Sequence, residues 1–149
     1  MGYYMRYIST DEREITIPSL ESVLKRVDPR YSITNVQKTP RESGNLMYGG
    51  EIYGQIEINR PGDELFEEEV EELKEFLSES RGKKKTVLQT LTNAKTIVAV
   101  QVLWQDRDTE QTLIRIDPLW DWLFNNRRGL LQADGEGYYD SSGLILQEE

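Results

Sequence analysis

The spacing of hydrophobic residues along the chain predicts four strand segments. Residues 3–9 and 31–36 are short β-prone runs, and residues 96–104 are almost all apolar and β-branched, as in a buried central strand. In residues 46–59 apolar and polar positions alternate, which predicts one strand with one solvated face. The polar segment 37–45 before it is predicted to be a loop.

Helical spacing, in which apolar residues recur every three or four positions, predicts four helices. They span residues 17–29, 63–80, 85–95 and 109–129. Pro118 lies within the last of these and predicts a kink or a restart there.

The element order β-α-β-β-α-α-β-α, followed by a hairpin, predicts a single α+β domain over residues 1–149. We expect a mixed or antiparallel sheet with helices mainly on one face. The first part of this order resembles a ferredoxin-like β-α-β-β-α-β unit with extra elements. The likeness concerns element order alone, so it does not indicate a function.

The absence of cysteine and histidine narrows the chemistry available to the chain. It excludes thiolate nucleophiles, zinc–thiolate sites and Ser–His–Asp mechanisms. Carboxylates, lysine, tyrosine, hydroxyl groups and oxygen-bound Mg²⁺ or Ca²⁺ remain. We find no catalytic motif and expect no cofactor.

Hydrophobic residues make up 37% of the chain and charged residues 30%, as in ordinary soluble proteins. No apolar stretch approaches the length that crosses a bilayer, which predicts no membrane association. The first ten residues lack the apolar core of a secretory signal. A cytoplasmic location is therefore expected.

Most of the net charge of −9 belongs to one predicted helix. Residues 63–80 hold nine acids and one lysine, a local charge of −8, which leaves −1 for the rest of the chain. Helix-dipole effects and solvation explain much of this pattern, and an acidic docking surface is the sharper alternative. That surface would use Glu67, Glu68, Glu71 and Glu72. The cations that follow have no interleaved aromatic residues, which argues against nucleic-acid binding.

Glu69 lies inside the apolar stripe of the same predicted helix. A carboxylate there must pair with a cation, reach the rim of the domain or accept a raised pKa. An arginine partner or a position at the rim is the simpler interpretation. A raised pKa would suit an acid–base catalyst.

Trp122 lies on the far side of the predicted helix 109–129 from its apolar stripe. An exposed tryptophan there would be a candidate for a homodimer or partner interface, because tryptophan is enriched in binding hot spots. The alternatives are that Pro118 reorients the segment or that another layer covers the side chain.

Asp134, Glu136 and Asp140 lie among glycines near the end of the chain. The spacing fails the EF-hand pattern at its diagnostic positions, whereas residues 140–143 fit a type I turn and predict a hairpin. One long strand and a three-strand meander both remain open. On one strand, Asp134 and Glu136 would project side by side and could hold Mg²⁺ or Ca²⁺ or divide acid and base roles.

These features favour a small, acidic, non-enzymatic protein-interaction domain, an adaptor or immunity-like module that binds a protein partner or itself. Its predicted binding residues are Trp122, Glu67, Glu68, Glu71 and Glu72. The alternative is a carboxylate-dependent or Mg²⁺/Ca²⁺-assisted hydrolase that uses Asp134 and Glu136, with Glu69 as a further catalytic candidate.

Overall fold

One antiparallel sheet contains all the strands in the computed structural model, which describes residues 2–77 and 81–148. Its strands are β1 (Tyr3–Ser9), β2 (Tyr31–Gln37), β3 (Glu42–Tyr48), β4 (Glu51–Asn59), β5 (Arg81–Gly82), β6 (Thr96–Val102), β7 (Gly129–Ala133), β8 (Gly137–Asp140) and β9 (Gly143–Gln147). Their order across the sheet is β2-β3-β4-β6-β1-β7-β8-β9-β5. The buried central strand expected at residues 96–104 is confirmed as β6. The ferredoxin-like arrangement is not confirmed, because β6 lies between β4 and β1.

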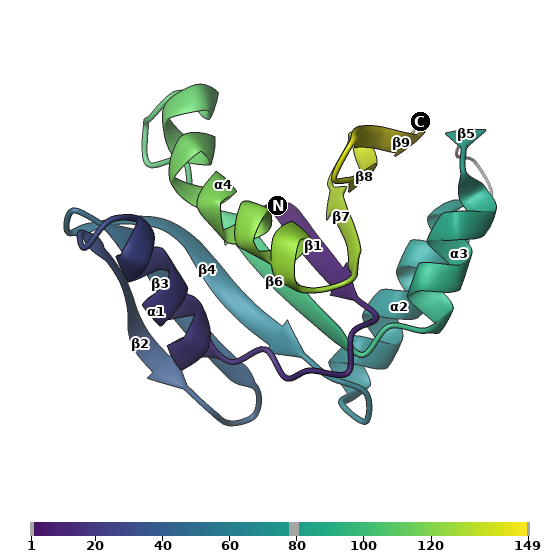
Figure 1. Cartoon of the computed structure of the whole chain (residues 1–149), viewed down its shortest axis with the longest axis horizontal. Coiled ribbons are helices and arrows are strands. Elements are labelled where there is room, and N and C mark those ends of the chain that lie inside the picture. The colour runs from purple at the N-terminus through teal and green to yellow at the C-terminus, as the bar shows by residue number, and fades with distance from the viewer. Residues whose placement is uncertain (1, 78–80, 149) are drawn as a thin grey trace.

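Helices cover both faces of the sheet (Figure 1). They are α1 (Ile17–Val27), α2 (Glu64–Phe76), α3 (Lys84–Thr92) and α4 (Thr109–Asn126). The mixed α+β class is confirmed, but α1 and α4 pack on one face and α2 and α3 on the other, rather than mainly on one. The reason lies in β6, where Val98 and Val100 join the core under α1 and α4 while Ile97 and Ala99 join the core under α2 and α3.

The predicted single strand over residues 46–59 is wrong, because it is two strands joined by a turn. Gly49 and Gly50 have φ angles of +60° and +83°, the left-handed values that tight hairpins require. The chain therefore reverses between β3 and β4. β3 begins at Glu42, inside the segment predicted as a loop.

The predicted helices are confirmed with shifted ends. Asp63 caps α2 by accepting a hydrogen bond from the Leu65 backbone N–H, and the predicted residues 78–80 lie outside the described part. α4 runs through Pro118 as one 18-residue helix, so the helix does not restart there. Both α2 and α4 begin at an aspartate that bonds to the first turn.

Of the two arrangements left open for the C-terminal segment, one long strand and a three-strand meander, the structure has the meander. β7, β8 and β9 pair with one another in sequence. The Asp140 carboxylate accepts the Ser142 backbone N–H at 2.8 Å in the β8–β9 turn. The predicted hairpin at residues 140–143 is therefore confirmed.

Candidate binding site

Part of the sheet face under α2 carries rows of mainly polar side chains across neighbouring strands. Glu57 on β4 is paired with Ala99 on β6, which is paired with Arg6 on β1, and Arg6 is in turn paired with Gln132 on β7. A second row joins Gln55, Gln101 and Tyr4. Since residues at equivalent positions on paired strands share a face, these side chains form a polar floor.

A cavity of about 230 Å³ lies between this floor and α2. We call it the α2 cavity. The methyl group of Ala99 is the smallest side chain on the floor, and larger residues flank it on both neighbouring strands. From the helix, Leu65, Glu68, Glu69 and Glu72 line the same space.

Arg6 holds the floor and the helix together. Its Nε donates to Glu69 Oε2 at 2.6 Å, and its Nη1 donates to Gln132 Oε1 at 2.7 Å and to Asp134 Oδ1 at 2.8 Å. The Arg6 and Glu69 side chains are only 16% and 15% exposed. Glu69 thus has the arginine partner that was the simpler interpretation of its position.

Asn59 brings a buried acceptor to the same cavity. It is 1% exposed, and its Nδ2 donates to Glu69 Oε1 at 3.3 Å. Its Oδ1 has no hydrogen-bond partner among the described residues. Rotating the amide would place that oxygen against the Glu69 carboxylate, so a donor from elsewhere would suit it better.

Glu57 closes the other side of the α2 cavity. Burial raises the pKa of Glu57 above its ordinary value, Arg41 lowers it, and the carboxylates of Glu69 and Asp63 raise it further. The Arg41 Nε lies 3.6 Å from both Glu57 Oε1 and Asp63 Oδ2 and makes no hydrogen bond within the described residues. Glu57 is therefore a carboxylate whose charge is only partly balanced.

The exposed side of α2 adds further carboxylates next to the cavity. Glu67, Glu68, Glu71 and Glu72 are all exposed, and none forms an ion pair with another described residue. Within the lining of the cavity itself, four glutamates face a single arginine. The site as a whole carries excess negative charge that Arg6 and Arg41 only partly neutralise.

The structure separates Asp134 from Glu136, so the side-by-side pair expected for one long strand does not form. Both lie in the turn between β7 and β8, where the Asp134 carboxylate accepts from Arg6 and from the Tyr4 backbone. The Glu136 carboxylate instead accepts from the hydroxyls of Tyr3 and, at 2.7 Å, Tyr139. Glu136 lines a different cavity, under α4. No group of three or more acidic side chains in the described ranges is placed to hold a metal ion.

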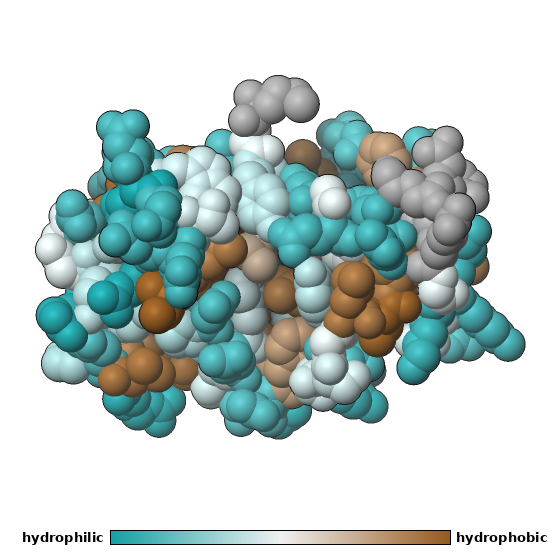
Figure 2. All heavy atoms as spheres, turned by 90° about the horizontal axis from the view of Figure 1, so that it is seen from above, coloured by the Kyte–Doolittle hydropathy of each residue, from teal (hydrophilic) through white to brown (hydrophobic). Residues whose placement is uncertain are grey.

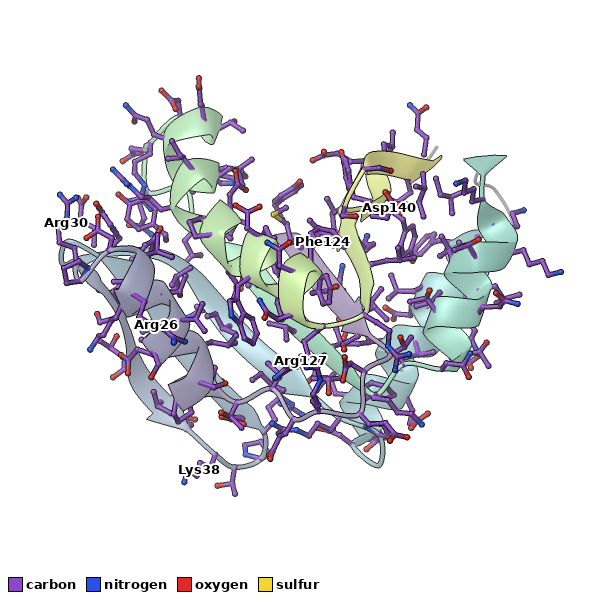
Figure 3. The ribbon with its side chains drawn as sticks, in the orientation of Figure 1. Arg26, Arg30, Lys38, Phe124, Arg127 and Asp140 are labelled. Atoms are coloured by element: carbon purple, nitrogen blue, oxygen red, sulfur yellow. The ribbon has the colours of Figure 1, made fainter. Side chains whose placement is uncertain are left out.

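Trp122 is half-buried rather than fully exposed, because α1 packs beside α4. The guanidinium of Arg127, which follows the end of α4 in Figure 3, lies 5.0 Å from its ring centre. Trp122 lines a groove with Pro118 and with Val27, which is 60% exposed. This groove is on the face of the sheet opposite to α2, so the structure does not bring Trp122 and the acidic glutamates together.

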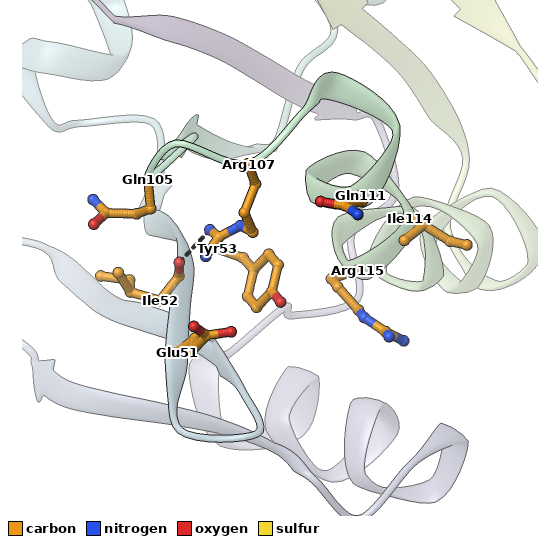
Figure 4. Close-up of a pocket in the computed structure, with 8 residues that line it drawn as sticks. All are labelled: Glu51, Ile52, Tyr53, Gln105, Arg107, Gln111, Ile114 and Arg115. Carbon is orange, nitrogen blue, oxygen red and sulfur yellow. Dashed lines mark hydrogen bonds between the residues drawn. The ribbon is translucent and has the colours of Figure 1, made fainter.

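A second cavity, of about 580 Å³, lies between the start of β4 and α4 (Figure 4). Arg107 stacks 3.8 Å above the Tyr53 ring and donates to the carbonyl oxygens of Ile52 and Leu103. Arg115 lies 4.0 Å from the centre of the Tyr48 ring. These contacts brace the β3–β4 hairpin against α4 and the loop that precedes it.

Arg6, Glu57, Asn59 and Ala99 were not among the residues predicted for a site. They lie on three strands that are distant in the sequence, and only the strand order places them together. The one available signal was the alternation in residues 51–59, which placed Glu57 on the polar side of its strand.

Comparison with known protein families, with curated proteins and with solved structures finds no match to this chain. Among the described residues, no helix combines the length and apolar character needed to cross a membrane.

Proposed function

We propose that this chain is a non-enzymatic protein-interaction domain that binds a basic segment of a partner protein through α2 and the α2 cavity. The observation that carries the proposal is the row of four exposed glutamates without intramolecular ion pairs beside an acid-lined cavity. Charges arranged in this way attract a partner of opposite sign and steer its approach. An adaptor or an immunity-like protein, acting in the cytoplasm, would need such a surface.

The shape of the site supports binding rather than catalysis. The hydrolase alternative relied on Asp134 and Glu136, but Glu136 lines the cavity under α4 while the Asp134 carboxylate accepts from Arg6 and the Tyr4 backbone. Glu69 is occupied by Arg6 and Asn59. The glutamates that remain available lie along one side of α2, where a partner can contact several of them at once.

The face seen in Figure 2 has a mixed hydrophobic and hydrophilic surface. There the hydrophobic residues form separate patches among hydrophilic ones. A partner that docked through a broad apolar surface would need a continuous patch.

Self-association through Trp122 is the second candidate. The observation in its favour is the groove in which exposed Val27 lies beside half-buried Trp122 and Pro118. An apolar groove with an aromatic side chain is a common centre of binding energy.

Affinity capture from a lysate of the native organism, followed by titration of the purified partner, tests the proposal. The test variant carries Glu→Gln at positions 67, 68, 71 and 72. We expect it to bind the basic partner about tenfold more weakly or worse, with a smaller dependence on salt.

A matched control changes the same charge elsewhere on the surface. It carries Glu→Gln at four exposed positions outside α2, namely Glu12, Glu14, Glu51 and Glu110. We expect this control to bind as the wild type does. Equal binding by both variants, or capture of a partner with no basic segment, would contradict the proposal.

A further inference from the structure

The α2 cavity has a defined shape because of Ala99. Glu57 and Arg6 are the register partners of Ala99 on either side. Two strand spacings therefore separate them, roughly 10 Å between their Cα atoms. The methyl group between two long polar side chains leaves a hollow that α2 covers with Leu65 and Glu69.

The hydrogen-bond acceptors around this hollow would be best satisfied by a positively charged donor. Asn59 Oδ1 is a buried acceptor without a partner among the described residues. Glu57 is a half-buried carboxylate that Arg41 reaches only at 3.6 Å. Leaving a buried acceptor unsatisfied costs free energy, so a ligand that donates to Asn59 and Glu57 together would be stabilised.

The arrangement of acceptors selects between the two cationic side chains of proteins. A guanidinium prefers both oxygens of one carboxylate, so pairing with Glu57 in that way would direct its donors to that side chain and away from Asn59 Oδ1. Asn59 Oδ1 and the Glu57 carboxylate belong to separate side chains. An ammonium group has three donors that point in different directions, and it can satisfy such a set.

We propose that the α2 cavity binds one primary ammonium group, the end of a lysine side chain of the partner. This inference rests on the proposed function and names the residue that the partner inserts. Leu65 and Ala99 are the apolar residues of the lining and would contact the aliphatic stem of lysine, while the ammonium donates to Asn59 Oδ1 and to Glu57.

The first experiment uses three probes with the purified full chain and ¹H–¹⁵N NMR. The probes are n-butylammonium and two acetylated, amidated pentapeptides with lysine or arginine between pairs of glycines. We expect n-butylammonium and the lysine peptide to shift the Ala99 amide and the Asn59 side-chain amide saturably. The arginine peptide is expected to shift them at least about tenfold less at equal concentration.

Two variants test whether the ligand binds in the α2 cavity. Ala99→Leu fills the hollow and should abolish the shifts of the Asn59 side chain. Glu57→Gln keeps the shape and removes one charged acceptor, and it should weaken binding about tenfold. Because Glu57→Gln is isosteric, it keeps the test decisive even if Ala99→Leu fails to fold.

The outcomes separate this inference from the proposed function. Absence of saturable shifts, equal shifts from the arginine peptide, or full binding by Glu57→Gln overturns the ammonium site. Binding of n-butylammonium without the lysine peptide overturns the partner lysine and assigns the site to a free amine. Saturable binding of the lysine peptide supports the ammonium site. It does so even if the variant with Glu→Gln at positions 67, 68, 71 and 72 captures the same partner as the wild type. That second result would contradict the proposed function alone.

Discussion

Arg6 is the residue on which the α2 cavity depends. It comes from β1 in the middle of the sheet and bonds to α2 through Glu69, to β7 through Gln132 and to the following turn through Asp134. One side chain thus fixes the position of the acidic helix relative to the floor. Buried ion pairs of this kind add little stability over apolar packing, but removal of one partner leaves an uncompensated buried charge.

Replacing Arg6 should therefore lower the stability of the folded chain. We expect Arg6→Met to lower the free energy of unfolding by about 3–5 kcal/mol, because Glu69 would remain as a buried charge without its partner. Urea denaturation measures this. Lys25→Met, which removes an exposed pair with Glu21 at 3.9 Å, is the control and should cost about 0.5 kcal/mol or less. A loss below 1 kcal/mol for Arg6→Met would show that Arg6 does not hold Glu69, taking ~1 kcal/mol as the upper range of surface pairs.

Glu136 raises the pKa of the Tyr139 hydroxyl. Its hydrogen bond to Tyr139, followed by burial, raises the pKa of Tyr139 to about 12. The folded pKa lies above the unfolded value, so the contribution to stability is complete below about pH 10 and is lost as the pH rises through about 12.

In Glu136→Gln we expect the pKa of Tyr139 to fall toward its ordinary value. The phenolate absorbance measured against pH, with Tyr139→Phe to assign the transition, checks this. An unchanged Tyr139 titration in Glu136→Gln would mean that burial alone causes the shift.

Two glycines in the hairpins have left-handed φ angles but different surroundings. Gly137 begins β8 with a φ of +135°, and a Cβ there would clash with the Leu146 carbonyl oxygen on β9. Gly50, in the β3–β4 turn, has a φ of +83° with open space around it. The two positions therefore share a backbone requirement and differ in their surroundings.

Gly137→Ala should destabilise the chain more than Gly50→Ala. We expect losses of about 3 kcal/mol or more for Gly137→Ala and about 1–2 kcal/mol for Gly50→Ala, because only the first adds a clash to the strained φ. Urea denaturation gives both values, and hydrogen exchange of β9 amides shows where the structure opens. Equal losses would mean that β9 moves away without cost.

The elements were largely predictable from local patterns, because caps and periodicity act over a few residues. Asp63 and Asp108 mark helix starts, and the apolar run of β6 marks a buried strand. Gly49 and Gly50 were misread, because two glycines fit an alternating pattern as well as a turn. The α2 cavity was not predictable, since Glu57, Ala99 and Arg6 meet only through strand order, which local patterns do not encode.

At the scale of the whole molecule, the sheet separates two candidate surfaces. The acidic glutamates of α2 are on one face, and Trp122 with its groove is on the other. Changes at sites without shared partners add independently. The two surfaces should therefore respond separately to mutation.

Trp122→Ala tests this separation. We expect it to lower the free energy of unfolding by about 1–3 kcal/mol, less than for a fully buried tryptophan, and to leave capture of the basic partner unchanged. Denaturation and the capture assay measure the two effects, and sedimentation velocity reports any loss of self-association. Loss of the basic partner in a folded Trp122→Ala protein would place its binding surface on α4 instead.

The central place of β1 has a consequence for the chain during synthesis. Tyr3 pairs with Val102 on one side and Met5 pairs with Ala133 on the other. A ribosome completes β1 long before either neighbour emerges, so both of its backbone edges stay unpaired until β6 and β7 have been made. Such edges recruit other strands. A nascent chain stalled before residue 129 would therefore depend on chaperones to stay unaggregated, and synthesis of β7 would pair the second edge of β1.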